Sequence, residues 1–420
     1  MHALEKILAN ASNKSEIKAG DFVNAEVDMA EVNDLYLQVI QQFYEFGGKR
    51  VKNPDNISFV FDHYSPAPTI KSAENQQKMR EFCQEQNIEH LFDVGKGICH
   101  QVMPESALVL PGKVLIATDS HTTTHGAFGC FGTGVGASDL AVTMLTGKLW
   151  FKVPEVIKIE VNGTLKPGVM AKDVILMIID RLKQDGAVYK AIEFCGETVE
   201  NMSLSSRMVL CNMAVEMGAK TSYIQPDEKV TKYFDSRTSE NYTIYETDPD
   251  YEYVAEYNFD VSSLNPLVSL PHSPDKIDEV KNVDEKIVDQ IFIGTCTGGR
   301  LEDIKAAVDI IKDKKVNTQT RLLVIPASDE VLLNAEDAGY IKVLLESGAI
   351  ISTPGCGPCL GAHQGVLSAG ETGITTSSRN FPGRMGSTES KLYITSPATA
   401  AASALTGELT DPSNYVLGGV

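Results

Sequence analysis

The sequence predicts an α/β fold with mostly parallel sheets, and three observations support this. Short apolar runs rich in β-branched residues alternate with stretches in which apolar residues recur at helical spacing. Glycine, proline or an acid–histidine group follows several of these runs, where parallel strands would end. A length of 420 residues with 43% apolar content is enough for two or three domains. We expect the domains to comprise residues 1–154, 155–271 and 272–420.

The first domain is expected to present two acid–histidine groups at strand ends. The runs 57–61 and 112–117 have the composition of strands, and a helix over 73–86 lies between them. An α/β sheet presents its chemistry beyond the carboxyl ends of its strands, so the residues that follow these runs are candidate catalytic groups. They are Asp62-His63 and Asp119-Ser120-His121.

A glycine-dense passage over 125–136 follows the second group. Glycine lets the backbone pack closely or approach a ligand. No GxGxxG directly follows a strand with an acidic residue about twenty positions further on, so dinucleotide binding is not indicated.

The middle domain is expected to open with a strand over 156–161 and a helix over 171–184. A further helix puts Asn212 and Glu216, four residues apart, on one face. An acid on a Met-rich helix is more often solvated or capping than catalytic, so this position alone assigns no role. We interpret the acidic, tyrosine-rich stretch 236–260 as a surface loop and an edge strand.

The last domain resumes the alternation of strand and helix around Cys296. A strand over 288–293 precedes this thiol and a helix over 301–312 follows it, so Cys296 lies on a strand-to-helix turn. A strand over 321–326 and a helix over 330–347 come next.

Two more thiols, Cys356 and Cys359, follow a strand over 349–352, so we expect three sulfurs at one sheet edge. A cubic iron-sulfur cluster normally has four cysteine ligands, and three would leave one iron open to act as a Lewis acid. Zinc with His363 as a fourth ligand, a redox dithiol and unliganded core cysteines are the alternatives.

Two arginines, Arg379 and Arg384, stand five residues apart across a glycine turn. The guanidinium fork suits carboxylates, although a pair of solvated arginines is the plainer interpretation without further context. Residues 397–405 are expected to form a closing helix.

Composition excludes several classes of function. A formal net charge of -19 argues against nucleic-acid binding, which needs a basic surface. No stretch approaches the roughly twenty apolar residues of a membrane span, and the amino terminus lacks the apolar core of a signal peptide. Eight cysteines do not form the dense pattern of a secreted disulfide scaffold, so we expect a reducing, cytoplasmic setting.

Six motifs run in order along nearly the whole chain: Gly97-Ile-Cys-His-Gln, Asp119-Ser-His-Thr, Cys211-Asn-Met-Ala-Val-Glu-Met-Gly, Gly294-Thr-Cys-Thr, Pro354-Gly-Cys-Gly-Pro-Cys-Leu-Gly and Arg379-Asn-Phe-Pro-Gly-Arg. Together they resemble the aconitase superfamily, and most closely its separate large subunits of the 3-isopropylmalate dehydratase and homoaconitase type. The resemblance implies three related α/β domains with the active-site cleft between them.

The resemblance also implies a cofactor and a set of site residues. One [4Fe-4S] cluster per chain would be held by Cys296, Cys356 and Cys359, with one iron not ligated by cysteine. The implied catalytic pairs are Asp62 with His63, Asp119 with His100, and Glu216 with His121. The implied substrate contacts are Gln38, Ser120, Asn212, Arg379 and Arg384. Each carboxylate can charge its imidazole, which can then protonate a departing hydroxide.

The resemblance further implies a partner. In this family the base that removes the carbon-bound proton is a serine on a swivelling domain, which is a separate small subunit in the isopropylmalate type. The chain stops at Val420 without a linker to such a domain. We therefore expect a small subunit to supply the serine and another arginine, and the chain alone to turn over little substrate.

Three positions depart from the family pattern. Gly298 and Ser378 stand where asparagines are usual, and Asn33-Asp-Leu-Tyr replaces His-Asp-Gly-Thr. Amides beside a metal centre tune it, so we expect altered redox behaviour or weaker cluster retention.

The leading hypothesis is reversible dehydration and rehydration of a substituted malate. The preferred substrates are 3-isopropylmalate and 2-isopropylmalate, and homoaconitate and methyl- or dimethylmalates are the alternatives. A hypothesis from another class is a non-catalytic, degenerate subunit that binds zinc or a cluster. Iron-responsive RNA binding, the third, fits poorly with the acidic charge.

Overall fold

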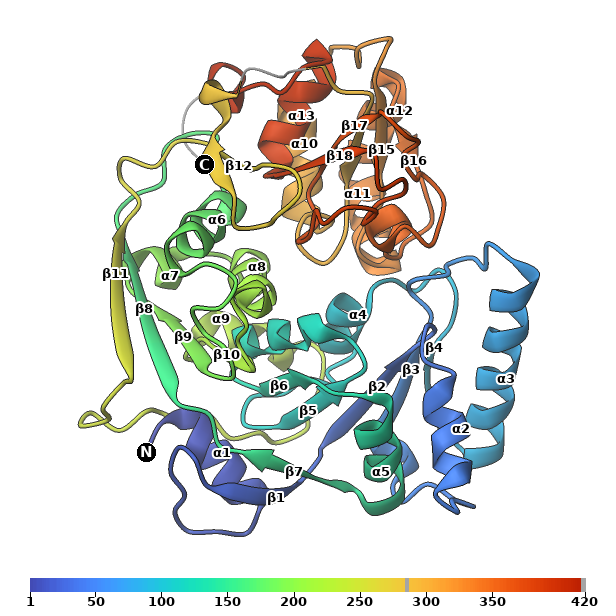
Figure 1. Cartoon of the computed structure of the whole chain (residues 1–420), viewed down its shortest axis with the longest axis vertical. Helices are drawn as coiled ribbons and strands as arrows, with labels where there is room; N and C mark the ends of the chain where they lie inside the picture. Colours follow the sequence, from blue (N-terminus) through green and yellow to red (C-terminus); the bar gives the residue numbers. More distant parts are fainter. Residues whose placement is uncertain (284–286, 417–420) are drawn as a thin grey trace.

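Three open sheets and a two-stranded ribbon organise the chain, of which the computed structural model describes residues 1–283 and 287–416 (Figure 1). Helices alternate with mostly parallel strands, which confirms the predicted α/β class. Across the described ranges, no helix is long and apolar enough to cross a membrane.

The first sheet has five parallel strands in the order β4-β3-β2-β5-β6. The chain order reverses between β2 and β5, and in such sheets ligands bind beyond the carboxyl ends at this switch point. Both β3 and β5 are buried along their whole length, as expected of strands covered on both faces. The strands are β2 (Met29–Asn33), β3 (Ile57–Val60), β4 (His90–Phe92), β5 (Val114–Ala117) and β6 (Phe131–Gly134).

Helices pack around this sheet, and a ribbon of two antiparallel strands lies below it (Figure 1). The predicted helix over 73–86 begins three residues earlier, because the Thr69 hydroxyl accepts a hydrogen bond from Ser72 N and caps the first turn. The helices are α1 (Ala3–Ala11), α2 (Gln38–Glu45), α3 (Ile70–Gln86), α4 (Cys99–Glu105) and α5 (Ala137–Thr146), and the ribbon is β1 (Phe22–Glu26) with β7 (Lys148–Lys152).

The second sheet has four parallel strands in the order β10-β9-β8-β11. Residues of β11 alternate between half-buried and exposed, which confirms the edge strand predicted within 236–260. The strands are β8 (Val156–Asn162), β9 (Ala191–Cys195), β10 (Thr221–Tyr223) and β11 (Ala255–Asp260), and the helices are α6 (Ala171–Leu182), α7 (Glu197–Asn201), α8 (Leu204–Met213) and α9 (Glu228–Asp235).

The third sheet has seven strands in the order β13-β12-β18-β17-β14-β15-β16. The five strands from β18 to β16 are parallel, and the chain order reverses between β17 and β14. The strands are β12 (Leu267–Ser269), β13 (Ile277–Glu279), β14 (Gln290–Ile293), β15 (Arg321–Val324), β16 (Ile350–Ile351), β17 (Thr372–Thr375) and β18 (Lys391–Thr395), and the helices are α10 (Leu301–Ile311), α11 (Asp329–Asp337), α12 (Tyr340–Ser347) and α13 (Pro397–Thr406).

The prediction of one continuous helix over 330–347 is wrong. The stretch 330–347 forms α11 and α12, because Gly339 adopts a left-handed conformation with φ +76° and ends the first helix.

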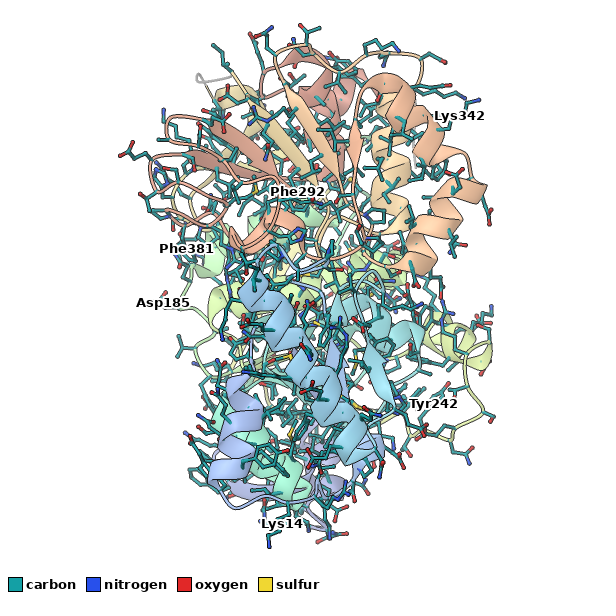
Figure 2. All side chains as sticks on the ribbon, turned by 90° about the vertical axis from the view of Figure 1, so that its right-hand side faces the viewer. Lys14, Asp185, Tyr242, Phe292, Lys342 and Phe381 are labelled. Atoms are coloured by element: carbon teal, nitrogen blue, oxygen red, sulfur yellow. The ribbon has the colours of Figure 1, made fainter. Side chains whose placement is uncertain are left out.

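The strands of each sheet fall within one of the three expected residue ranges, except that β12 precedes residue 272 and pairs in the third sheet. One apolar core runs from Leu115 in the first sheet to Ile157 and Ile175 around the second, so these two regions pack as one body. The third sheet has a core of its own. Figures 1 and 2 show this last part stacked on the other two.

Candidate active site

A cavity of about 540 Å³ lies where the three regions meet. Residues that follow β2, β5 and β6 form one wall, residues near β10 form another, and the loops after β16 and β17 close a third. The switch points of the first and third sheets therefore face the same space. Its charged and histidine side chains are His63, Asp119, His121, Asp139, Lys220, Arg379 and Arg384.

The first predicted pair, Asp62 and His63, follows β3 directly. His63 Nδ1 donates to Asp62 Oδ1 at 2.6 Å, and Asp62 Oδ2 accepts from Cys99 N at 3.0 Å. Asp34, at the end of β2, accepts from the backbone N–H of His63 at 3.1 Å. Burial alone would lower the pKa of His63, but Asp62, then Asp34 and Asp119, raise it to about 10. His63 is thus held as an imidazolium at neutral pH.

The second predicted pair shares its carboxylate with a third ring. Asp119 Oδ1 lies 3.2 Å from His100 Nε2 and 3.3 Å from His121 Nδ1, and it accepts from His121 N at 2.7 Å. Burial raises the pKa of Asp119, but hydrogen bonds from His100 and His121 outweigh it and hold the pKa well below its usual range. Asp119 therefore orients two imidazoles at once.

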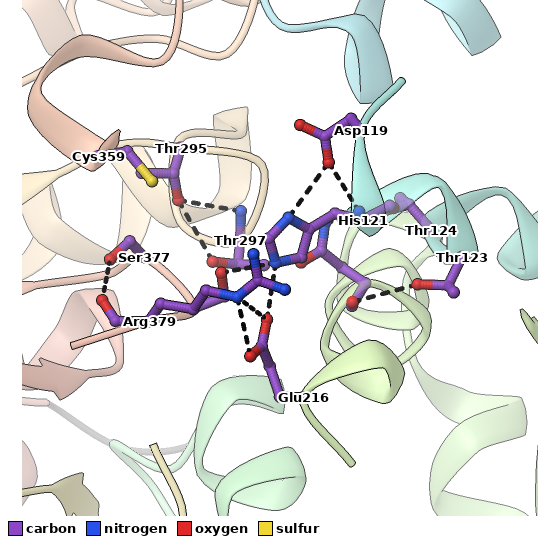
Figure 3. Close-up of polar contacts among 12 residues, drawn as sticks. Asp119, His121, Thr123, Thr124, Glu216, Thr295, Thr297, Cys359, Ser377 and Arg379 are labelled. Atoms are coloured by element: carbon purple, nitrogen blue, oxygen red, sulfur yellow. Dashed lines mark hydrogen bonds and ion pairs between the residues drawn. The ribbon is translucent and has the colours of Figure 1, made fainter. Parts of the chain in front are cut away.

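The third predicted pair joins the first and second regions. His121 Nε2 lies 2.8 Å from Glu216 Oε1, in the 3₁₀ turn Ala214–Met217 that follows α8. Arg379 Nε donates to Glu216 Oε2 at 3.0 Å, and Ser378 Oγ lies 2.9 Å from His121 Nε2. Figure 3 shows Asp119 and Glu216 on opposite sides of the His121 ring, with Arg379 against Glu216. Burial raises the pKa of Glu216, but His121 and Arg379 lower it below its usual value.

The three thiols gather at the edge of the third sheet. Cys356 Sγ, a His63 ring nitrogen and an Asp62 oxygen all lie within 4.8 Å of one another. Gly355 permits this approach, since a Cβ there would lie 2.7 Å from Asp62 O, which accepts from Cys356 N at 2.8 Å. Burial and the neighbouring Cys359 raise the pKa of Cys296 to about 12, and burial, Asp62, Cys359 and Cys296 raise that of Cys356. The three sulfurs therefore interact electrostatically.

Cationic groups around the thiols fit a negatively charged inorganic centre. Arg384 Nη2 donates to Cys359 Sγ at 3.6 Å. Arg300 is 1% exposed, and its Nε donates to Gln101 Oε1 at 2.9 Å, whereas both terminal nitrogens lack a hydrogen-bond partner in the described part of the chain. It interacts electrostatically with Asp303 and then with Cys296. A buried guanidinium with two unpaired nitrogens is costly unless negative charge compensates it, and Asp303 supplies part of that charge. Three thiolates around a metal centre would supply the rest.

His363, the proposed fourth ligand of the zinc alternative, is bonded through one ring nitrogen, which leaves Nδ1 as the nitrogen that could ligate a metal. His363 Nε2 lies 2.6 Å from Pro66 O, a carbonyl that only accepts, so this ring nitrogen donates its proton there. His363 does not belong to the group formed by Asp62, His63 and Cys356.

The predicted substrate contacts divide into two groups. Ser120, Arg379 and Arg384 line the cavity, and Asn212 is buried nearby, where Nδ2 donates to Thr124 Oγ1 at 2.7 Å. Gln38 is exposed at the first residue of α2 and is not among the lining residues.

Sequence reasoning missed some of the residues in and around this site. Asp34 belongs to the segment Asn33-Asp-Leu-Tyr, which departs from the family pattern, and nothing in its spacing indicates a contact with His63. Tyr36 lines the cavity two residues before Gln38. Lys220 also lines it, with its Nζ 3.3 Å from Gly134 O.

Two of the three departures from the family pattern, Gly298 and Ser378, have structural explanations. A Cβ at Gly298 would overlap the Thr376 side chain, so Thr376 occupies the room that a larger residue 298 would need. Ser378 places a hydroxyl, in place of an amide, against His121.

The arrangement defines an α/β protein in which groups able to transfer protons lie close to thiols able to hold a metal. The chain belongs to the aconitase family, because the family model described as aconitate hydratase matches residues 5–407.

Relatives cover nearly the whole chain. The 3-isopropylmalate dehydratase large subunit 1 of Methanopyrus kandleri is 50% identical over 413 residues, 98% of this chain and 99% of that one. The 3-isopropylmalate dehydratase large subunit of Moorella thermoacetica is 46% identical over 418 residues, 99% of each. The probable methanogen homoaconitase large subunit of Methanothermobacter thermautotrophicus is 46% identical over 417 residues, 98% and 97%. Among solved structures, holo aconitase X of Thermococcus kodakaraensis has a TM-score of 0.49 at 13% identity over 90% of each chain, too distant a likeness to support a conclusion.

Proposed function

We propose that the chain is the large subunit of a hydro-lyase that interconverts 3-isopropylmalate and 2-isopropylmalate, a step of leucine biosynthesis. The observation that carries the proposal is the approach of Cys356 to the Asp62–His63 pair, beside a cavity lined by His63, Asp119 and His121. Relatives named as 3-isopropylmalate dehydratase large subunits, up to 50% identical, support the substrate class.

The thiols would hold the cofactor. Cys296, Cys356 and Cys359 are three ligands for one [4Fe-4S] cluster per chain, which leaves one iron not ligated by cysteine. When bound, the cluster supplies a Lewis acid that polarises the substrate hydroxyl. Arg300 and Arg384 contribute positive charge beside these ligands.

The histidines would handle the proton. His63 lines the cavity, and its Nδ1 is bonded to Asp62, so the proton available to substrate lies on Nε2. Its imidazolium can transfer this proton to a departing hydroxide, which is far more basic. Asp119 and Glu216 keep the rings of His100 and His121 in fixed orientations around the same space.

The arginines would bind the substrate carboxylates. Arg384 has no carboxylate partner among the described residues, so it is free to form a charge-assisted pair with substrate. Arg379 also lines the cavity, and its Nε is bonded to Glu216, so its two terminal nitrogens are left to bind a carboxylate. Two cations suit a dicarboxylic acid.

A separate small subunit would complete the site. The relatives are named as large subunits, which supports a partner of this kind. We propose that its swivelling domain supplies the serine base for the carbon-bound proton, and that the complex works in the cytoplasm.

Anaerobic reconstitution with iron and sulfide, followed by addition of the small subunit, tests this function. We expect about four irons with acid-labile sulfide per chain. When 3-isopropylmalate is added, we expect ultraviolet absorbance from the enoate that forms by its dehydration. Turnover of homoaconitate alone would favour the second candidate, which a 46% identical relative supports. One zinc per chain and no turnover of any 2-alkylmalate would refute the proposal in favour of a non-catalytic subunit.

A further inference from the structure

A buried lysine lies behind the thiols. Lys172, in the first turn of α6, is 1% exposed. Its Nζ lies 2.8 Å from Thr297 Oγ1, 2.8 Å from Thr376 O and 3.0 Å from Ser377 O. Thr297 and Ser377, both labelled in Figure 3, belong to the two loops at the switch point of the third sheet. One side chain of the middle region thus joins the loop of Cys296 to the loop that leads to the substrate arginines.

These contacts favour the charged form of the amine. Two of the three acceptors are carbonyl oxygens, which cannot donate. The Thr297 hydroxyl lies 2.8 Å from Thr376 O and can donate its own proton there, so it is left to accept from Lys172. Three donated hydrogens require an ammonium group.

The ammonium has no carboxylate at hydrogen-bond distance in the described ranges, because all three of its acceptors are neutral. Burial of an unpaired charge is costly. Burial lowers the pKa of Lys172 to about 7, and the negative groups that oppose this shift are, from largest to smallest, Cys296, Asp303, Cys359 and Asp173. Two of these four are candidate cluster ligands.

We propose that Lys172 is the fixed counter-charge of the thiolate-bound cluster, a positioning residue that sets the reduction potential and iron retention of the centre; the proposal rests on the function proposed above. A nearby positive charge favours the more negative, reduced state of a cluster, whose potential depends on net charge, hydrogen bonds and exposure. The same charge stabilises three thiolates held close together.

The test compares Lys172→Met with wild type after anaerobic reconstitution. Methionine has about the length of lysine and carries no charge. We expect the midpoint potential of the cluster to become more negative. We also expect iron release to a chelator to become about tenfold faster, because substitution of residues that support metal ligands typically weakens metal binding about 10- to 100-fold. Lys172→Arg, which keeps the charge, should recover much of the wild-type potential. Lys166→Met is the matched control, because Lys166 also donates to neutral acceptors, Ser263 O and Asn265 Oδ1, but on the surface.

Thr297→Val provides a second arm that does not depend on Lys172→Met folding. It removes one hydrogen-bond acceptor and keeps the charge, so we expect the potential to stay near that of wild type. The inference fails if loaded Lys172→Met has the wild-type potential and iron release, or if Thr297→Val alone makes the potential clearly more negative than that of wild type. Wild type that takes up no iron and sulfide would instead refute the proposed function.

Discussion

Asp62→Asn offers the sharpest test of the proton chemistry. The substitution removes the carboxylate that does most to raise the pKa of His63. With a pKa of about 10, His63 is about 99% imidazolium at pH 8, whereas a pKa near 6.5 would leave about 3%. We therefore expect kcat/KM at pH 8 to fall by up to about 30-fold, with less loss if Asp34 and Asp119 retain part of the shift.

The pH dependence distinguishes this cause from general damage. Activity of Asp62→Asn should recover as the pH falls towards 6, because the remaining imidazole becomes protonated. The assay is enoate absorbance from the reconstituted complex between pH 6 and 10. Asp93→Asn, which removes a carboxylate paired with Arg80, should keep the wild-type profile. A profile of Asp62→Asn that matches wild type in shape would refute the role of Asp62.

The raised pKa of His63 also predicts that wild type is more stable than Asp62→Asn at low pH. A paired carboxylate has the opposite effect, because it stabilises the fold at high pH. A raised histidine pKa stabilises the fold fully below the unfolded value near 6.5, and the stabilisation is lost as the pH rises through about 10. The full shift corresponds to about 5 kcal/mol, an upper limit because other carboxylates share it. Urea unfolding should show Asp62→Asn furthest below wild type near pH 6 and equal to it above pH 10.

The remaining predictions concern the thiols, the arginine and the glycine. Cys359→Ser should fold with normal circular dichroism but lose most of its iron, whereas Cys195→Ser, away from the cavity, should retain it. Arg384→Met should raise KM by about 10- to 100-fold through loss of a charge-assisted carboxylate pair, with a smaller change in kcat. Gly298→Asn should destabilise the chain by about 1–3 kcal/mol in urea unfolding, because its side chain overlaps Thr376, and Thr376→Ala should restore part of this loss.

Local patterns predicted most of the elements because they depend on neighbours in the chain. The apolar runs that became β3, β5 and β14 are short, β-branched and followed by polar or glycine residues, so their ends were found to within a few residues. The break at Gly339 was missed, since both helices around it continue the same apolar spacing.

The site was only partly accessible from sequence. The three acid–histidine pairs followed from the motifs, and the structure brings all three within hydrogen-bond distance. That Asp119 serves both His100 and His121 could not be inferred, because a pairwise assignment gives each carboxylate one ring. Gln38, an expected substrate contact, is exposed and does not line the cavity, whereas Tyr36, two residues earlier, does.

The sequence by itself determined the strand ends that carry the chemistry and the three thiols available to one centre. Only the tertiary structure decided which charges are buried together. Lys172 is 125 residues from Thr297 along the chain, and Asp34 is 29 residues from His63. No local spacing encodes such contacts, because the free energy of a buried ion depends on the groups that the folded sheets bring around it.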